Sequence, residues 1–393
     1  MEQLKRSMAG LSIALCLSAA LAGCNGFHAG GRGLPRADAT ESAFRIDETE
    51  NLPSARPEVS KTLLWMDGAR LPTYLLPEGG LCLQLADVAD AAGGGFQTES
   101  DTGVLSVWGR ELRFREGSAA VEGAEETLLL SAPVLSRGGV WYAPAGELLS
   151  ALGLTELIDP EQDQRWYTHI VKHDAVPTGY RIPILMYHAV SDDLWGEPEL
   201  FVSPAALEEE IQALLDAGYT PITFEDLDHI QKIEKPVILT FDDGYDDNYT
   251  ELFPILRKYN VKASVFIIVN DIGKNHKLTA EQIREMSDSG LVSIQSHTMS
   301  HGFLSEMNEA QLRSEHYDSM LALARITGKQ PFVMCYPSGV NTELSSSVTA
   351  EYYEYGLIMG GACYVSGSDP YQIPRYYISR FTDLDRFLAK LAG

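Results

Sequence analysis

The chain has 393 residues, of which 45% are hydrophobic, and this length and composition are sufficient for two globular domains. Asp and Glu number 55 against 30 Lys and Arg, which gives a formal net charge of -25. Such an acidic surface repels nucleic acid and anionic lipid headgroups, so we expect no nucleic-acid partner and favour a neutral polymer. Five cysteines in this length are too few for a disulfide framework.

The first 24 residues predict an export signal. Lys5 and Arg6 precede an apolar stretch, residues 8–22, that is too short to span a bilayer comfortably. The tetrapeptide Leu-Ala-Gly-Cys that ends at Cys24 is typical of a lipoprotein cleavage box. We therefore expect an exported lipoprotein, anchored through lipid on Cys24 to the outer side of the cytoplasmic membrane. A plain secretory signal that is cut nearby is the alternative.

Two further regions precede the second half of the chain. Residues 25–60 are rich in Gly, Pro, Ala, Ser and charged side chains, which predicts a flexible tether. Residues 61–167 predict a small α+β domain with a weak internal repeat, because Glu78-Gly79-Gly80 with residues 81–93 matches Arg137-Gly138-Gly139 with residues 140–153. Each copy has a turn, a short strand pattern and a helix-like pattern. The region resembles the N-terminal domain of copper amine oxidases, but no cluster of metal ligands accompanies it, so we interpret it as a spacer or envelope-binding module.

Strand-like and helix-like patterns alternate in residues 181–393. This alternation predicts a parallel sheet with outer helices, hence an α/β domain. The predicted strands are residues 184–186, 237–241, 263–269 and 292–294. One predicted helix begins at Ser203, and two others cover residues 248–259 and 279–289.

Chemically suggestive residues follow two of these strands. Asp242 and Asp243 come directly after an apolar run, at the strand end where α/β folds place catalytic groups, although Asp-Asp-Gly is also an ordinary turn sequence. His297 and His301 follow another apolar run, four residues apart, so that both imidazoles can lie on one side of a compact loop. Two imidazoles and one carboxylate form a typical zinc ligand set, and three protein ligands leave a position open for water.

These residues carry a resemblance to a known family. Thr-Phe-Asp-Asp-Gly at 240–244 and His-Thr-Met-Ser-His at 297–301 resemble the first two motifs of the polysaccharide deacetylases, the NodB-homology carbohydrate esterases of family four. Residues 183–190, 278–292 and 335–339 are similar to the branch that deacetylates poly-N-acetylglucosamine, and the resemblance covers residues 181–391. It implies a distorted (β/α) barrel and metal-dependent hydrolysis of the N-acetyl groups of N-acetylglucosamine units, with release of acetate, in an extracellular or cell-wall polysaccharide.

The resemblance also implies a role for each residue. Asp243, His297 and His301 would bind Zn²⁺ or another divalent transition metal, which polarises the acetyl carbonyl and activates water. Asp242 would be the general base. The usual C-terminal Leu-x-His is missing, and His188 in Leu-Met-Tyr-His would replace it as the general acid, as in a circularly permuted branch.

Other departures concern the third motif, where Cys335-Tyr336-Pro337-Ser338 lacks the usual arginine. We expect Arg375 to supply the missing charge, the backbone near Ser338 to contribute to an oxyanion hole, and Tyr187 and Tyr336 to lie nearest the sugar. Two alternatives stay open: a peptidoglycan N-acetylglucosamine deacetylase, and a carbohydrate-binding surface lipoprotein that has lost turnover.

Overall fold

The computed structural model describes residues 56–76, 80–123 and 127–392. The predicted signal, Cys24, residues 25–55 of the predicted tether, and Glu78 and Gly79 of the repeat lie outside the described residues. In the part that is described, no helix is long and apolar enough to cross a membrane. The described residues belong to one compact unit, and the predicted boundary between residues 61–167 and 181–393 stays a prediction.

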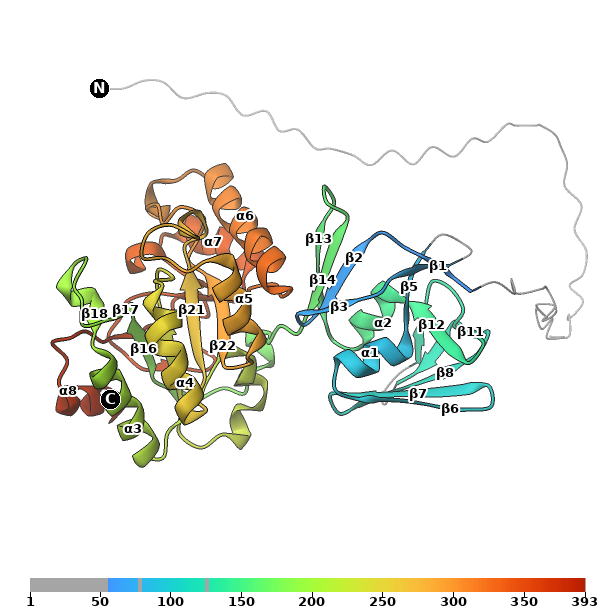
Figure 1. The fold of residues 1–393 in the computed structure, drawn as a ribbon, viewed down its shortest axis with the longest axis horizontal. Helices are drawn as coiled ribbons and strands as arrows, with labels where there is room; N and C mark the ends of the chain where they lie inside the picture. The colour runs from blue at the N-terminus through green and yellow to red at the C-terminus, as the bar shows by residue number, and fades with distance from the viewer. Residues whose placement is uncertain (1–55, 77–79, 124–126, 393) are drawn as a thin grey trace, which may run out of the picture. The chain divides into compact units, whose positions relative to one another are not determined.

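The N-terminal part contains the predicted repeat as two strand and helix units (Figure 1). Strand β5 (Leu81–Gln84) leads into helix α1 (Leu85–Ala91), and β12 (Val140–Pro144) leads into α2 (Ala145–Ala151). The two strands pair antiparallel, with Leu83 opposite Ala143. The apolar residues of both helices are buried in one core, which explains the helical spacing of those residues in each copy.

Together with β5 and β12, the other strands of this part form three sheets. Two are antiparallel, of order β1-β4-β5-β12-β11 and β10-β9-β8-β7-β6, and the third is mixed, of order β13-β14-β2-β3. Their bounds are β1 (Glu58–Val59), β2 (Leu63–Met66), β3 (Ala69–Leu71), β4 (Tyr74–Leu75), β6 (Gly95–Glu99), β7 (Thr102–Val107), β8 (Arg110–Arg115), β9 (Ala120–Glu122), β10 (Thr127–Leu129), β11 (Leu135–Arg137), β13 (Thr155–Asp159) and β14 (Gln164–Thr168). Because β1 pairs with β4, sheet structure begins before the predicted end of the tether.

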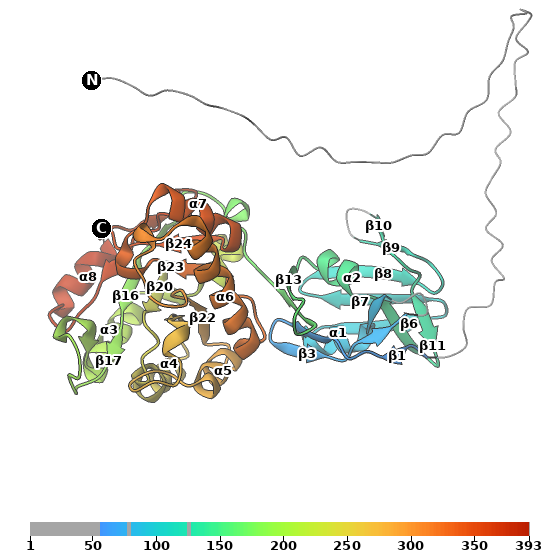
Figure 2. The ribbon, with the colours of Figure 1, turned by 90° about the horizontal axis from the view of Figure 1, so that it is seen from above.

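The C-terminal part is built on a curled parallel sheet of order β24-β23-β22-β21-β20-β16-β26, with β19 also paired to β20. Its strands are β16 (Ile184–Tyr187), β19 (Thr220–Ile222), β20 (Pro236–Phe241), β21 (Ala263–Ile267), β22 (Val292–Ser296), β23 (Val333–Cys335), β24 (Tyr355–Leu357) and β26 (Tyr376–Tyr377). The helices are α3 (Pro204–Asp216), α4 (Phe253–Tyr259), α5 (Ala280–Asp288), α6 (Glu309–Thr327), α7 (Glu343–Tyr352) and α8 (Leu384–Ala392), and they surround the strands in both views (Figures 1 and 2). Short strands outside this sheet are β15 (Arg181–Ile182), β17 (Ala189–Val190), β18 (Phe201–Val202) and β25 (Tyr364–Val365).

The burial of β20 explains why apolar and polar residues do not alternate in its sequence. Every residue of Pro236–Phe241 is buried, since helices or other core residues cover both faces of a parallel sheet. The predicted α/β class and the four predicted strands are therefore confirmed. Ser203 caps α3 by accepting a hydrogen bond from the Ala206 amide, and Thr279 caps α5 in the same way, which confirms both predicted helix starts.

One predicted helix differs from the structure. Residues 248–252 form a π-helical turn, and regular α-helix begins only at Phe253. Pro254 has no amide hydrogen to donate to the carbonyl four residues earlier, and the Phe253 amide instead donates to the Asn248 carbonyl five residues earlier. The wider turn therefore follows from a proline placed just inside the helix.

A segment near the C-terminus joins the two edges of the curled sheet. Ile373 bridges to Leu357 of β24, while Tyr376 of β26 pairs with Leu185 of β16. The sheet thus approaches closure as a distorted (β/α) barrel, which confirms the predicted fold. Arg375 lies on this closing segment, between the two points of attachment.

Buried Glu210 on α3 gives a testable prediction about stability. It is 4% exposed, accepts a hydrogen bond from the Tyr187 hydroxyl at 3.0 Å, and has a pKa that burial raises from 4.5 to about 8. The folded protein therefore holds this proton more tightly than the unfolded chain, so the stabilisation is present at low pH and is lost as pH rises from 4.5 to about 8. We compare the free energies of unfolding of Glu210→Gln and wild type. Between pH 6 and pH 9, the difference should move in favour of the variant by on the order of a few kcal/mol.

Thermal unfolding of both proteins at the two pH values measures this difference. Exposed Glu281→Gln on α5 is the control and should show no such pH dependence. An equal stability difference between Glu210→Gln and wild type at pH 6 and pH 9 would contradict the prediction.

Candidate active site

The predicted catalytic and metal-binding residues meet at the carboxyl ends of neighbouring parallel strands. His188 follows β16, Asp242 and Asp243 follow β20, and His297 follows β22. All of them, together with His301, line one pocket of about 660 Å³. This volume is in the range of small-molecule sites, and it lies where open and barrel-shaped α/β sheets bind ligands.

Asp243, His297 and His301 have the arrangement of a metal site. The Nε2 atoms of His297 and His301 lie 3.4 and 3.6 Å from Asp243 Oδ1. Two ligands that are each about 2.0–2.1 Å from a tetrahedral zinc lie about 3.3–3.4 Å apart, so these separations fit one ion. Asp243 Oδ1 is buried and has no hydrogen-bond partner, as expected for an oxygen that a cation would satisfy. Burial alone would raise the Asp243 pKa, but neighbouring His297 lowers it and the carboxylate stays ionised.

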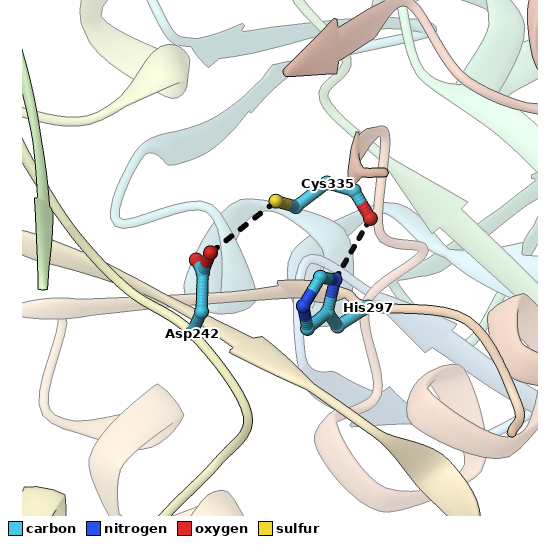
Figure 3. Close-up of side chains that lie close together, drawn as sticks. All are labelled: Asp242, His297 and Cys335. Atoms are coloured by element: carbon cyan, nitrogen blue, oxygen red, sulfur yellow. Dashed lines mark hydrogen bonds between the residues drawn. The ribbon is translucent and has the colours of Figure 1, made fainter. Parts of the chain in front are cut away.

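A backbone contact fixes the orientation of His297. Its Nδ1 lies 2.8 Å from the carbonyl oxygen of Cys335 (Figure 3). Since a carbonyl can only accept, Nδ1 carries a proton, and Nε2 is the nitrogen that lies toward Asp243 and could offer its lone pair to a metal. Such a contact is the usual support of a metal-binding histidine.

Backbone strain concentrates around these residues. Asp243, Thr298, His301 and Ser338 all have φ between 57° and 72°, in the left-handed region that non-glycine residues rarely adopt. The loop from Thr298 to His301 is held by Glu315, whose carboxylate accepts from two backbone amides and the Ser300 hydroxyl of that loop. Each left-handed residue costs about 1–3 kcal/mol, and strain of this kind clusters at functional sites.

A second set of potential metal ligands, Asp242, His297 and Cys335, is also close together. Arg375 excludes a cation there, because its guanidinium contacts both the Asp242 carboxylate and the Cys335 sulfur. Burial also raises the pKa of the Cys335 thiol, so the sulfur keeps its proton and is a poor ligand. Of the two groups, Asp243, His297 and His301 are therefore the better candidate for a metal site.

Arg375 pairs with Asp242 through two parallel hydrogen bonds. Nη1 donates to Oδ1 and Nη2 donates to Oδ2, both at 2.8 Å, and both side chains are almost completely buried. Burial would raise the Asp242 pKa, but the Arg375 guanidinium lowers it to about 2. Asp242 is thus ionised, and Arg375 lies where the predicted replacement for the missing motif-three arginine must lie.

Asn248 and Asp247 hold the backbone at and after His188 through hydrogen bonds. The Asn248 amide donates to the His188 carbonyl at 3.0 Å, and Asp247 accepts from the Val190 amide at 3.0 Å. These side chains thus hold the segment that follows β16. Burial lowers the pKa of His188, and the nearby carboxylates of Asp242 and Asp243 oppose that shift.

Two aromatic predictions need correction. Tyr187 is fully buried, stacks on Phe241 and donates to Glu210, so its side chain points into the core and away from the pocket. Tyr336 lines the pocket, but its residue is 0% exposed, and its ring packs in the core against Gly356. Neither ring is available to a sugar.

Sequence reasoning missed Tyr377, whose ring lines the pocket edge-on to His188 with centroids 5.9 Å apart. Its hydroxyl donates to the Glu199 carbonyl at 2.7 Å. The spacing of Arg375 and Tyr377 could have revealed it, because alternate residues of an extended segment face the same side. Ser338 is exposed and also lines the pocket, and its part in an oxyanion hole stays a prediction.

The fold and the site together define a class of protein, namely distorted α/β barrels with an Asp-His-His metal site beside a buried aspartate. Comparisons with known proteins agree. The family model for polysaccharide deacetylase matches residues 229–356. The Bacillus anthracis protein BA0330, a solved structure, is 32% identical, with a TM-score of 0.52 over 54% of this chain and 69% of that one. The chain belongs to the polysaccharide deacetylase family.

Curated relatives match parts of the chain. YxkH of Bacillus subtilis (strain 168), named as a polysaccharide deacetylase, is 36% identical over 183 residues, which are 45% of this chain and 64% of YxkH. The poly-β-1,6-N-acetyl-D-glucosamine N-deacetylase of Staphylococcus epidermidis is 27% identical over 165 residues, 37% of this chain and 55% of that protein. This chain thus spans less than two thirds of each of these two curated relatives.

Proposed function

We propose that this protein hydrolyses the N-acetyl groups of N-acetylglucosamine units in an extracellular or cell-wall polysaccharide and releases acetate. One observation carries the proposal: the Arg375-held carboxylate of Asp242 lies in the same pocket as the Asp243, His297 and His301 group, with His188 also on the wall. A hydrolase of this kind needs a base, an acid and an electrophile around one reacting carbonyl. The name of the Staphylococcus epidermidis relative supports the choice of glycan.

Each residue of the site has its own role in the proposed reaction. A divalent metal, which we propose is zinc, would be held by Asp243, His297 and His301 and would supply Lewis acidity toward the acetyl carbonyl and the attacking water. Asp242 takes the proton of that water, and Arg375 holds its carboxylate ionised and correctly aimed. His188 gives a proton to the departing amine. Burial lowers the pKa of His188, which makes its protonated form a stronger acid.

The loss-of-turnover alternative is weaker than the sequence suggested. It depended on a missing motif-three arginine and a missing C-terminal Leu-x-His. Arg375 makes the contact with Asp242 that the arginine would make, and His188 lies in the pocket. The peptidoglycan alternative uses the same chemistry on another polymer, so a comparison of substrates can distinguish it.

Acetate release from β-1,6 and β-1,4 N-acetylglucosamine oligomers tests the proposal. The chain from Asn25 onward is assayed with zinc and with a chelator. We expect release that depends on metal, and faster release from the β-1,6 oligomers supports a poly-N-acetylglucosamine substrate. Faster release from the β-1,4 oligomers indicates a chitin-like or peptidoglycan-like substrate, and no release despite bound metal would overturn the proposed activity.

We also propose that the protein is anchored at the cell surface through lipid on Cys24. The proposal rests on residues 5–24, whose charge and apolar pattern fit a lipoprotein signal. Cells that express the wild-type protein should incorporate labelled fatty acid into it, and Cys24→Ala should abolish this label and release the protein from the membrane fraction. Equal labelling of the two proteins would contradict the assignment.

A further inference from the structure

Cys335 contacts three parts of the candidate site at once. It ends β23 and is fully buried. Its sulfur lies 3.4 Å from Asp242 Oδ2, and its backbone carbonyl accepts the hydrogen bond from His297 (Figure 3). The sulfur also lies 2.7 Å from Arg375 Nη2. The residue therefore connects the proposed base, the arginine that holds it and one proposed metal ligand.

The chemistry of the three groups sets the direction of each contact. A guanidinium can only donate, so the Cys335 sulfur accepts from Arg375 Nη2. An ionised carboxylate can only accept, so the thiol hydrogen points to Asp242 Oδ2. Arg375 Nη2 donates to that same oxygen at 2.8 Å. Oδ2 is thus held by two donors, one at the end of β23 and one on the closing segment, and rotation of the carboxylate would break both contacts.

The size of the side chain at position 335 matters as well. Cys335 lies in the third motif, which lacks its usual arginine, and Arg375 reaches the same place from the closing segment. The two side chains are in contact, so a larger residue at 335 would displace the guanidinium from Asp242. A small side chain that can both donate and accept fits this position, as the Cys thiol does and a Ser hydroxyl would.

We propose that Cys335 is a positioning residue for Asp242: its thiol donates to Oδ2, accepts from Arg375, and keeps the carboxylate aimed into the pocket. This inference rests on the proposed function. It gives the thiol a role in positioning the base.

Kinetics of Cys335→Ala, Cys335→Ser and Cys82→Ala test the role. Loss of one weak hydrogen bond to the base should lower kcat of Cys335→Ala about tenfold and leave KM unchanged, because Asp242 acts on the attacking water and not on substrate binding. Cys335→Ser, which restores a donor and acceptor, should recover most of the loss. Cys82→Ala removes an equally buried thiol from the N-terminal part and should keep wild-type kcat. Wild-type kcat in Cys335→Ala, or no recovery in Cys335→Ser, would overturn the proposal.

A spectroscopic measurement tests the contact without activity. The Raman S–H stretching band of Cys335 is obtained as the difference between wild type and Cys335→Ala. We expect this band to move toward the position of a free thiol in Asp242→Asn, where the charged acceptor is gone; an unchanged band would overturn the contact. Failure of the wild type to release acetate from any glycan would overturn the proposed function alone, since the band would still report on Cys335.

Discussion

Asp242→Asn is expected to lower kcat for acetate release by about 10²–10⁴-fold, the usual contribution of a general base. The amide has nearly the same shape as the carboxylate but cannot take the proton of the attacking water. Asp243, His297 and His301 are untouched, so the variant should bind as much metal as wild type. Equal metal content with lost turnover separates a failed proton transfer from a failed metal site.

The same variant should also be less stable. Arg375 is 1% exposed, and the change leaves its charge without the carboxylate partner. Breaking one side of a buried ion pair costs about 3–5 kcal/mol, which denaturant unfolding can measure. Exposed Asp288→Asn is the control and should change neither activity nor stability. Turnover of Asp242→Asn within a few fold of wild type would remove Asp242 from the base role.

His301→Ala should abolish both stoichiometric metal binding and turnover. His301 is the most exposed of the three proposed ligands, with 35% of its side chain accessible, so its removal disturbs little of the core. Two remaining ligands bind a divalent ion far more weakly than three. The expected result is an apoprotein at metal concentrations that saturate wild type, with acetate release below detection.

Stability provides a second readout of the same site. A metal that binds only the folded state stabilises wild type by about 2.7 kcal/mol when its concentration is 100 times Kd. Wild type should therefore show a higher Tm with zinc than with chelator, and His301→Ala should show no difference. Exposed His229→Ala is the matched control and should respond like wild type. A zinc-dependent rise in Tm that survives in His301→Ala would place the metal elsewhere.

The class of fold and the principal residues of the site could be predicted from the amino-acid sequence. Apolar runs such as Val237 to Phe241 predict buried strands because both faces of a parallel sheet are covered, and this holds without knowledge of the neighbours. Asp242, Asp243 and His297 come directly after such runs, so their place at the strand ends follows from local order alone. The resemblance of the motifs to those of the polysaccharide deacetylases then predicted a distorted barrel within the α/β class.

Which side chains surround the pocket depends on the tertiary structure. Tyr187 directly precedes His188, and Tyr336 directly follows Cys335, yet both tyrosine residues are 0% exposed and their rings pack in the core. Neighbouring residues of an extended segment point to opposite sides, and the sequence does not say which side is the site. The pairing of Arg375 with Asp242 spans 133 residues and depends on the segment that joins the sheet edges. Cys335 contacts both Arg375 and Asp242 for the same reason. The long-range order of the strands, and not a local sequence pattern, brings these side chains together.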